Sequence, residues 1–378
     1  METAGPALPL PGGVYAVGFY DGSLMCEEPD GSQTEIGFRC FYPAAEPSGE
    51  PALYYPQREM LDMQLELPLY EPFAAMLEGL LSLPTHSFEG AKPPETEEKF
   101  PVVVYSHGYT TFAWSNLIQF EELASRGYVV FALSHPGDAF WAPTREGRPI
   151  GVNQATVKAA EDDYARFAQT VNVTDPDALT LEEIAAFLRA SVTIGERVEA
   201  WTRHTIAAFD EIERIAGDPE SPLAGRLDVS GYGLFGHSLG GAASLNTALF
   251  DERVRAAVNL DGWQYGFNLA ERAIPVPGLV MATSARHLPA NYLPGDPNLA
   301  YAIVPGGTHW FFCDFAVLAG DALRASDPSI GIDGNTMSRL TGDMLLAFFD
   351  RHLRGDSQAS IEKSAAGYAE YIKLQLHG

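Results

Sequence analysis

Apolar residues fall in short unbroken runs that alternate with longer stretches of helical period. Residues 100–108 ("FPVVVYSHG") and 128–137 ("YVVFALSHPG") form continuous apolar runs, which are typical of strands buried on both faces. Between them, residues 114–127 ("WSNLIQFEELASRG") have the pattern of a helix that ends at glycine. The alternation continues toward the C-terminus, with strands expected at 231–238, 255–262, 278–283 and 301–307 and helices at 239–250 and 337–355.

The first hundred residues have a different pattern. Residues 14–21 and 36–42 are rich in aromatic and β-branched residues and predict two strands. Residues 70–84 ("YEPFAAMLEGLLSLP") predict a short helix with a strongly apolar face. Two interpretations of this face stay open: it packs onto its own domain, or it serves as a surface-seeking or substrate-entry helix.

Buried strands separated by helices predict an α/β protein whose mostly parallel sheet is covered on both faces. Residues 154–216 are expected to be largely helical. The stretch 138–197 is longer than one crossover connection needs, so we expect part of it to form a helical cap insertion. With no internal repeat, the chain of residues 1–378 is interpreted as a single domain.

Composition and charge narrow the classes of function. Apolar residues make up 46% of the chain and charged residues 20%, as in a soluble globular protein with a large core. The net charge of −26 argues against binding to nucleic acid or to anionic lipid. No apolar stretch is long enough to span a bilayer, and the N-terminus lacks the pattern of a signal peptide. We therefore expect a cytoplasmic protein, with secretion left open.

The cysteines and histidines give no sign of a metal centre. Cys26, Cys40 and Cys313 make no even framework; a Cys26–Cys40 bridge is conceivable, but reduced thiols are favoured. The nine histidines and three cysteines show no CxxC, HxH or HExxH spacing. We expect neither a metal ion nor another cofactor.

The stretch "YGLFGHSLGG" carries the main chemical signal. Ser238 follows an apolar strand and precedes a helix, and Gly236 and Gly240 leave space for a sharp turn. This strand–turn–helix context is the one that a nucleophile elbow requires. A serine hydroxyl is a weak nucleophile that needs a base. In enzymes that carry a nucleophile elbow, the catalytic residues follow one another along the chain in the order serine, acid, histidine.

His309 is the favoured base, because it lies on a loop just after the expected strand 301–307. His287 also follows a strand and remains the alternative, whereas His352 and His377 are interpreted as surface residues.

Asp261 is the favoured acid, because it ends the expected strand 255–262 at the same edge of the sheet. Asp296, in a proline-rich loop, is the reserve candidate. Asp251 precedes the strand and is expected at the opposite end of the sheet.

Acyl transfer also needs hydrogen-bond donors aimed at the developing oxyanion. The backbone amide of Leu239, directly after the nucleophile, is one candidate, and the amide of Tyr109 in the "SHGY" loop is the other. We expect His107 to shape that loop through hydrogen bonds and His237 to be structural.

Aromatic residues fall in loops or at strand ends near these groups, where they could line an apolar acyl pocket or simply pack. The candidates are Trp114, Phe140, Trp141, Trp263 and Trp310.

Four segments resemble, in order, those of the platelet-activating factor acetylhydrolase family, the plasma-type group VII phospholipases A2 and their bacterial relatives. They are "VVVYSHGYTTF", "GLFGHSLGGAA", "AAVNLDGW" and "GTHWFFCDF", and the resemblance runs over about residues 12–355. It implies an α/β-hydrolase fold with nucleophile Ser238, acid Asp261 and base His309, and oxyanion amides at Tyr109 and Leu239.

The resemblance also implies Ca²⁺-independent hydrolysis of short or oxidised sn-2 acyl chains of phospholipids, and often of simple short-chain esters. The family's interface-binding segment falls near residues 70–84, where Glu71 and Glu78 in this acidic chain disfavour docking to a lipid surface. The cap region 138–197 is too dissimilar for substrate contacts to be carried over.

Three hypotheses follow for function. The first is a serine esterase with the substrates of this family. The second is a general carboxylesterase or polyester hydrolase without phospholipid preference, which the acidic surface favours. The third is a hydrolase-like binding protein that has lost catalysis, and the intact order of serine, acid and histidine argues against it.

Overall fold

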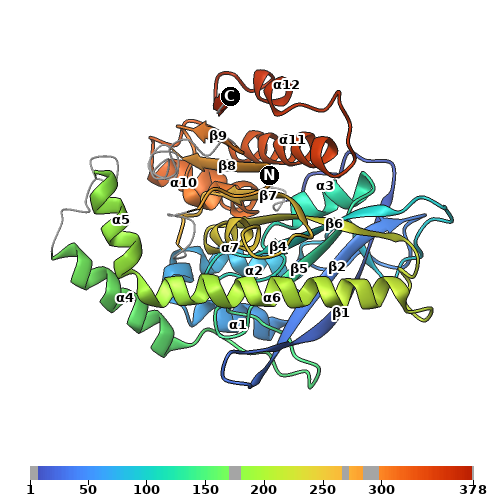
Figure 1. Cartoon of the computed structure of the whole chain (residues 1–378), viewed down its shortest axis with the longest axis horizontal. Helices are drawn as coiled ribbons and strands as arrows, with labels where there is room; N and C mark the ends of the chain where they lie inside the picture. Colours follow the sequence, from blue (N-terminus) through green and yellow to red (C-terminus); the bar gives the residue numbers. More distant parts are fainter. Residues whose placement is uncertain (1–6, 170–179, 266–271, 284–297, 377–378) are drawn as a thin grey trace.

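A ten-stranded, mostly parallel sheet forms the centre of the molecule in a computed structural model (Figure 1). The structure describes residues 7–169, 180–265, 272–283 and 298–376. The strand order is β10-β9-β8-β7-β6-β4-β5-β2-β1-β3. This arrangement confirms the predicted fold class of a mostly parallel sheet with helices on both faces.

The parallel part of the sheet runs without interruption from β5 to β9. Residues along β4 alternate between two hydrophobic clusters, with Val103 and Tyr105 facing one and Val102 and Val104 facing the other. Both faces are covered, which explains why this strand is apolar from Phe100 to Tyr105. The strands are β4 (Phe100–Ser106), β5 (Val129–Ser134), β6 (Leu227–His237), β7 (Val254–Leu260), β8 (Gly278–Thr283) and β9 (Leu299–Val304).

Further strands, some paired antiparallel and one paired in parallel, extend the sheet at both ends. The long hairpin of β1 (Ala16–Glu27) and β2 (Gln33–Ala44) joins β5 through β2. Strand β3 (Ser87–Glu89) pairs with β1, and β10 (Lys373–Leu376) pairs with β9. The hairpin strands are both longer than predicted.

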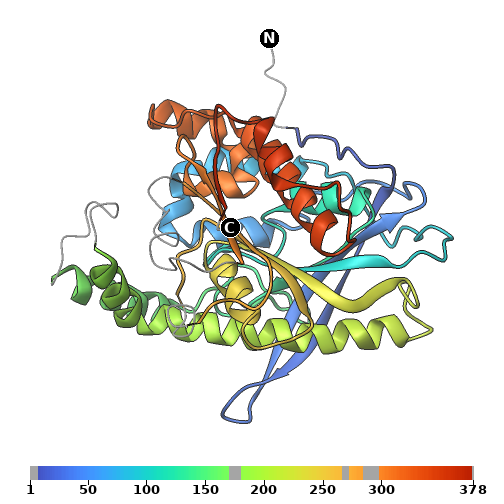
Figure 2. The same ribbon diagram turned by 45° about the horizontal axis from the view of Figure 1, so that its top comes forward.

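Helices cover the two faces. On one face, α3 (Leu117–Ser125) packs against α11 (Gly334–His352). On the other, α6 (Val192–Gly217) runs across the sheet and packs on α7 (Leu239–Thr247), as Figures 1 and 2 show. The remaining short helices of the C-terminal part are η5 (His309–Phe312), α9 (Phe315–Leu318), α10 (Gly320–Ser326) and α12 (Ile361–Ala366).

Two helices project from the body of the molecule before α6 begins. They are α4 (Gln154–Ala168) and α5 (Leu181–Ala190), at the left of both views (Figures 1 and 2). Both lie within the segment 138–197 that we interpret as a cap insertion.

The sequence predicts one short helix over residues 70–84, and this prediction is wrong: the segment is divided into shorter helical pieces. Pro72 lies inside it, and a proline lacks the amide hydrogen that a continuous helix needs. Tyr70, Leu77 and Leu80 are buried in the main core, which favours the packing interpretation of its apolar face. Residues 68–82 form η1 (Pro68–Phe73), α2 (Ala74–Gly79) and η2 (Leu80–Ser82). A separate helix, α1 (Arg58–Leu65), precedes them.

The three cysteines are buried and free, as expected. Cys26 lies opposite Thr34 and Cys40 opposite Tyr20 in the β1–β2 ladder, so this register does not place the two cysteines opposite each other. Across the described ranges, no helix is long and apolar enough to cross a membrane.

Candidate active site

Ser238 occupies a strained turn between β6 and α7. Its backbone angles are φ 56° and ψ −121°, a conformation that costs free energy for any residue with a side chain. A Cβ atom on Gly236 would lie 2.2 Å from the carbonyl carbon of Gly240, and one on Gly240 would lie 2.0 Å from the carbonyl oxygen of Ser106. Both glycines of the motif are therefore required by close backbone packing.

The end of β7 supports the same turn. The amide of Ser238 donates to the carbonyl of Leu260 at 2.8 Å. A Cβ on Gly262 would lie 2.0 Å from the carbonyl oxygen of Ser238. The residues on either side of Asp261 are thus packed directly against the serine turn.

Asp261 and His309 form a hydrogen-bonded pair. The Nδ1–H group of His309 donates to Oδ2 of Asp261 at 2.7 Å. The other carboxylate oxygen, Oδ1, accepts from the backbone amide of Thr283 at 2.9 Å. The Asp261 side chain is fully buried, whereas that of His309 is 26% exposed. Asp261 can therefore orient a ring whose Nε2 edge remains available for proton transfer.

His237 links the serine turn to the loop that carries His309. Its Nε2–H group donates to the backbone carbonyl of His309 at 3.0 Å, and the two rings lie 4.6 Å apart. His237 therefore has the structural role that was expected: it ties the residue before Ser238 to the backbone of His309.

The "SHGY" loop lies beside Ser238. A Cβ on Gly108 would lie 3.5 Å from Cβ of Ser238. His107 donates through Nδ1 to the carbonyl of Gly108 at 2.7 Å, and its Nε2 accepts from the amide of His135 at 3.2 Å. Burial lowers the pKa of His107 to about 4, so it is neutral at pH 7. His107 thus shapes the loop, as expected.

The two expected oxyanion donors lie on neighbouring segments. Leu239 is the first residue of α7, where backbone N–H groups have no acceptor within the helix. The ring of Tyr109 packs against the small hydrophobic cluster that contains Leu239 and Trp201. The loop is held further by Asp138, whose carbonyl accepts from the amide of Thr110 and whose carboxylate accepts from Trp201 Nε1.

The five aromatic candidates divide into two groups. Trp114, Phe140 and Trp141 are buried in the main core, and Trp114 donates through Nε1 to a backbone carbonyl. Trp310 and Trp263 are half-buried and directly follow His309 and Gly262 in the chain.

The two half-buried tryptophans contact different parts of the chain. Trp310 makes an edge contact with Tyr70 at 6.1 Å between ring centroids. Trp263 makes an edge contact at 5.1 Å with Phe187 of α5. The projecting helices are therefore joined to the loop that follows Asp261.

The alternative candidates are placed as follows. His287, Asp296 and His377 lie outside the described residues. Asp251 precedes β7 and forms an ion pair with Arg253, at the opposite end of the strand from Asp261, as expected. His352 is half-buried against Phe348 rather than fully on the surface, because the last turn of α11 packs there.

Sequence reasoning missed Thr283 and Asn259. Thr283 ends β8 and fixes the carboxylate of Asp261 through a backbone amide, which leaves no trace in residue type. The Asn259 side chain accepts from the amide of Gly262 at 2.7 Å and donates to its carbonyl at 2.9 Å. It thereby holds the turn around Asp261, which itself has a positive φ of 56°.

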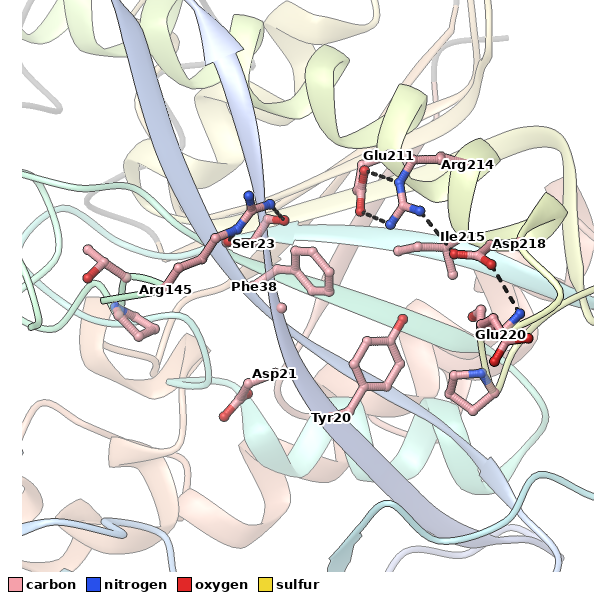
Figure 3. Close-up of a pocket in the computed structure, with 15 residues that line it drawn as sticks. Tyr20, Asp21, Ser23, Phe38, Arg145, Glu211, Arg214, Ile215, Asp218 and Glu220 are labelled. Carbon is pink, nitrogen blue, oxygen red and sulfur yellow. Dashed lines mark hydrogen bonds and ion pairs between the residues drawn. The ribbon is translucent and has the colours of Figure 1, made fainter. Parts of the chain in front are cut away.

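A pocket of about 480 Å³ lies away from this centre, between the β1–β2 hairpin and the end of α6 (Figure 3). Tyr20 and Phe38 form its apolar wall. Its arginines are engaged: Arg214 with Glu211 and Asp218, and Arg145 with Ser23. The pocket therefore offers mainly an apolar surface and no part of the pair formed by Asp261 and His309.

The sheet order, the serine turn and the Asp261–His309 pair define the class of protein as an α/β-hydrolase. A solved ferulic acid esterase from Streptomyces cinnamoneus has the same fold, with a TM-score of 0.67, 23% identity and coverage of 94% of this chain and 96% of that one. The model of a family described as PET hydrolase-like matches residues 190–293.

The N-terminal part points to a narrower group. The model of the family "Platelet-activating factor acetylhydrolase, isoform II" matches residues 4–146. The platelet-activating factor acetylhydrolases of Canis lupus familiaris and Cavia porcellus are each 25% identical and align with 92% of this chain and with 77% and 78% of their own lengths. The chain is thus an esterase-type hydrolase related to the platelet-activating factor acetylhydrolase family, and the resemblance read from its motifs is confirmed.

Proposed function

We propose that this protein is a serine carboxylic-ester hydrolase that acts on short acyl esters through Ser238, His309 and Asp261. The observation that carries the proposal is the buried Asp261 carboxylate bonded to His309, beside a serine held at positive φ. In the free state, the proton of the neutral imidazole lies on Nδ1, because Asp261 accepts it. The unprotonated Nε2 is then the atom that serves as base.

The reaction proceeds in two balanced halves. Nε2 of His309 takes the hydroxyl proton of Ser238 as Oγ bonds to the ester carbonyl carbon. The tetrahedral intermediate expels the alcohol, which receives that proton from His309, and an acyl-serine ester remains. Water then gives a proton to His309 and attacks the acyl group. Ser238 recovers its proton as the carboxylic acid leaves.

The amides of Tyr109 and Leu239 are proposed to bind the oxyanion of both intermediates. Support comes from the close approach of Gly108 to Ser238 and from the position of Leu239 at the start of α7. Such fixed donors are worth about 3–4 kcal/mol of transition-state stabilisation when one is removed. Both donors belong to the main chain, so side-chain replacement leaves them in place.

The preferred substrate class is a phospholipid with a short or oxidised sn-2 acyl chain, or a simple short-chain ester. Relatives with platelet-activating factor acetylhydrolase activity by name support this choice. The second candidate is a general carboxylesterase or polyester hydrolase, supported by the PET hydrolase-like match over residues 190–293. The net charge of −26 also favours soluble, uncharged esters over anionic lipid surfaces.

Two half-buried tryptophans are proposed as substrate contacts, Trp263 and Trp310, because each directly follows a residue of the site. Phe140, Trp141 and Trp114, which are buried in the main core, are then packing residues. We propose that the segment 138–197 acts as a cap, supported by the contact of Phe187 with Trp263.

Turnover of p-nitrophenyl acetate tests the catalytic assignment. Ser238→Ala should lower kcat by at least about 10,000-fold, because the nucleophile is removed. Ser230→Ala changes an exposed serine on the same strand and should leave kcat unchanged. Near-normal activity in Ser238→Ala would refute the assignment. Failure of a fluorophosphonate probe to label Ser238 would instead favour the hypothesis of a binding protein without catalysis.

A comparison at equal concentration separates the two substrate classes. An sn-2-acetyl phosphocholine, the matching long-chain sn-2 lipid, a soluble acetate ester and a polyester film are offered to the same enzyme. Higher kcat/KM for the sn-2-acetyl lipid than for the soluble ester supports the first class. Equal or lower values, together with release of monomer from the film, support the second.

A further inference from the structure

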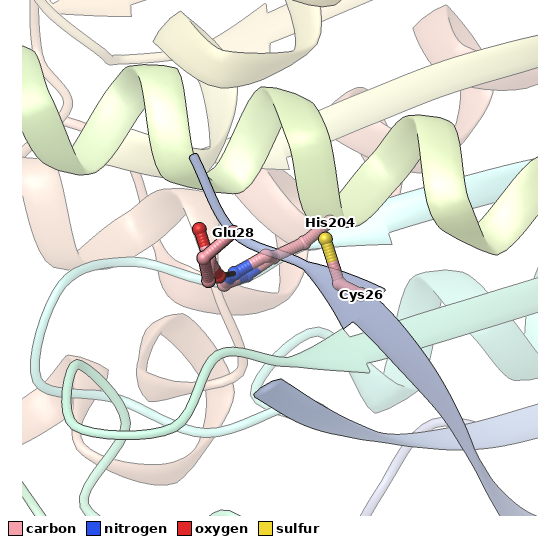
Figure 4. A group of neighbouring side chains, drawn as sticks. All are labelled: Cys26, Glu28 and His204. Carbon is pink, nitrogen blue, oxygen red and sulfur yellow. Dashed lines mark hydrogen bonds and ion pairs between the residues drawn. The ribbon is translucent and has the colours of Figure 1, made fainter. Parts of the chain in front are cut away.

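Three side chains able to bind a metal ion meet between the end of β1 and helix α6, away from the catalytic centre (Figure 4). They are Cys26, Glu28 and His204, and one ligand atom from each lies within 4.8 Å of the others. The sequence predicts no metal site, because residues so far apart in the chain make no ligand motif. The cluster exists only because α6 crosses the β1–β2 hairpin.

The geometry of the three groups is close to that of a tetrahedral site. Bond lengths of zinc to N, O and S imply ligand–ligand separations of about 3.3–3.6 Å. Nε2 of His204 already lies 3.1 Å from Oε1 of Glu28, so only the Cys26 thiol has to approach by about 1 Å. We propose that Cys26, Glu28 and His204 bind a divalent ion of the zinc type, with the fourth position open.

The choice of ion follows from the ligand set and its surroundings. Sulfur, imidazole nitrogen and a single carboxylate oxygen suit Zn²⁺ or Co²⁺ better than Mg²⁺ or Ca²⁺, which prefer oxygen alone. Cys26 and His204 are nearly fully buried, and burial excludes competing water from those two ligands. On binding, the ion displaces the proton of the Cys26 thiol.

A neighbouring pocket gives the ion a way in. The pocket has a volume of about 430 Å³, and both Glu28 and His204 line it. Arg203 binds Oε2 of Glu28 at 2.9 Å, so Oε1, which lies 3.1 Å from Nε2 of His204, is the oxygen that would bind the ion. The carboxylate is thereby limited to a single bond with the ion, and an ion that enters the pocket reaches Glu28 and His204 directly.

His204 is supported from behind by a second buried histidine. Its Nδ1 lies 3.0 Å from Nδ1 of His135, and Nε2 of His135 lies 3.0 Å from Oγ of Ser106. A carboxylate paired with Arg203 can only accept, so without an ion His204 donates from Nε2 to Glu28. His204 Nδ1 then accepts from His135, and His135 Nε2 accepts from Ser106. Glu28 therefore fixes the direction of each hydrogen bond in the series from Glu28 through His204 and His135 to Ser106.

A bound ion reverses that direction. Nε2 of His204 must offer its lone pair to the metal, so its proton lies on Nδ1 and is donated to His135. His135 then carries its own proton on Nε2 and donates to Ser106. Ser106 ends β4, directly before the loop of His107 and Tyr109. The metal site is therefore connected to the proposed oxyanion loop without movement of the backbone.

Cobalt(II) titration of the full chain tests the site. We expect one ion per chain, a tetrahedral visible spectrum and a near-ultraviolet thiolate-to-cobalt band, displaced by one equivalent of Zn²⁺. Cys26→Ala should abolish the thiolate band, and Glu28→Gln should weaken binding by more than tenfold. Glu27→Gln changes the exposed acidic neighbour and is the matched control.

Two outcomes would overturn the site. One is the absence of a thiolate band in the native chain. The other is a band that survives Cys26→Ala, which would assign the sulfur to Cys40 or Cys313. Circular dichroism and the urea midpoint of each variant show whether it is folded. Glu28→Gln removes a ligand without opening a cavity, so weaker binding in a folded Glu28→Gln chain is interpretable even if Cys26→Ala is unstable.

Nitrogen-15 spectra of the histidines test the connection to Ser106. With Zn²⁺ bound, the proton of His135 should move from Nδ1 to Nε2, whereas zinc bound at another surface site would leave it on Nδ1. A His135 signal that does not change at full zinc occupancy would refute the reversal. This readout is independent of esterase activity, and therefore of the proposed function.

Discussion

Replacing Asp261 by asparagine tests the central pair of the site by exchanging one carboxylate oxygen for an NH₂ group. Both carboxylate oxygens accept hydrogen bonds: Oδ1 from the backbone amide and the hydroxyl of Thr283, and Oδ2 from His309. The Thr283 amide cannot change from donor to acceptor. The amide oxygen of asparagine must therefore stay at Thr283, which points its NH₂ group toward His309.

The consequence falls on the position of one proton. Facing a donor, Nδ1 of His309 has to accept, so the proton of the neutral ring moves to Nε2. Nε2 is the atom that should take the proton of Ser238, and in this tautomer it can no longer do so. The same exchange in a serine protease triad lowers kcat by about 10,000-fold. That factor corresponds to about 5 kcal/mol of lost transition-state stabilisation.

Initial rates with p-nitrophenyl acetate at pH 8 give the measurement. We expect kcat of Asp261→Asn to fall by about 10,000-fold while KM changes less than threefold, because the substituted side chain is buried behind the ring. Asp251→Asn, at the other end of β7, should keep normal kcat. Activity within tenfold of the native enzyme in Asp261→Asn, with loss in Asp296→Asn, would refute the assignment and favour the reserve acid.

Three further predictions concern the surroundings of the pair. His237→Gln removes the ring that donates a hydrogen bond to the backbone carbonyl of His309. The loss of a hydrogen bond worth about 1 kcal/mol implies a fall in kcat of about fivefold. An unchanged kcat would show that the hydrogen bond between His237 and His309 is dispensable. Gly240→Ala should lower the free energy of unfolding in urea by about 3 kcal/mol, because its methyl group would lie 2.0 Å from a backbone oxygen of β4. Gly217→Ala, whose methyl group meets no atom within 4 Å, is the control. Equal stability of the two variants would contradict this packing. Burial holds the pKa of His107 at about 4 instead of 6.5, so the unfolded chain binds more protons than the folded chain between these pH values. As pH falls from 6.5 to 4, this residue should therefore lower the free energy of unfolding by up to about 3 kcal/mol. In His107→Gln the urea midpoint should fall less over that range, and a fall identical to that of the native chain would show that His107 is not responsible.

The sequence predicts the buried strands well because their environment is simple. Strand β4 is covered on both faces, so its positions from Phe100 to Tyr105 are all apolar and the run stands out. The outer strands are harder to predict. Residues 22–27 of β1 and all of β10 carry polar or exposed positions, because the described residues cover these segments only in part. The segment 70–84 was predicted as one helix because its apolar residues had helical spacing, while Pro72 divides it.

For the candidate site, the sequence predicts residues whose type is itself informative. Ser238, Asp261 and His309 follow strand ends in the order of the hydrolase class, and the last two are hydrogen-bonded in the structure. The contribution of Thr283 is a backbone amide, which any residue could supply. The clustering of Cys26 with His204 depends on how a helix crosses a hairpin, and no local pattern encodes that crossing.

The backbone of Ser238 also bears on the balance between stability and turnover. Its φ of 56° and ψ of −121° cost about 1–3 kcal/mol for a residue with a side chain. Glycine would relax this conformation, but it would also remove the hydroxyl. A screen for heat resistance alone is therefore expected to enrich glycine variants at position 238, which lack the proposed nucleophile. Thermostability and turnover have to be selected together here, because the strained residue and the proposed nucleophile are the same one.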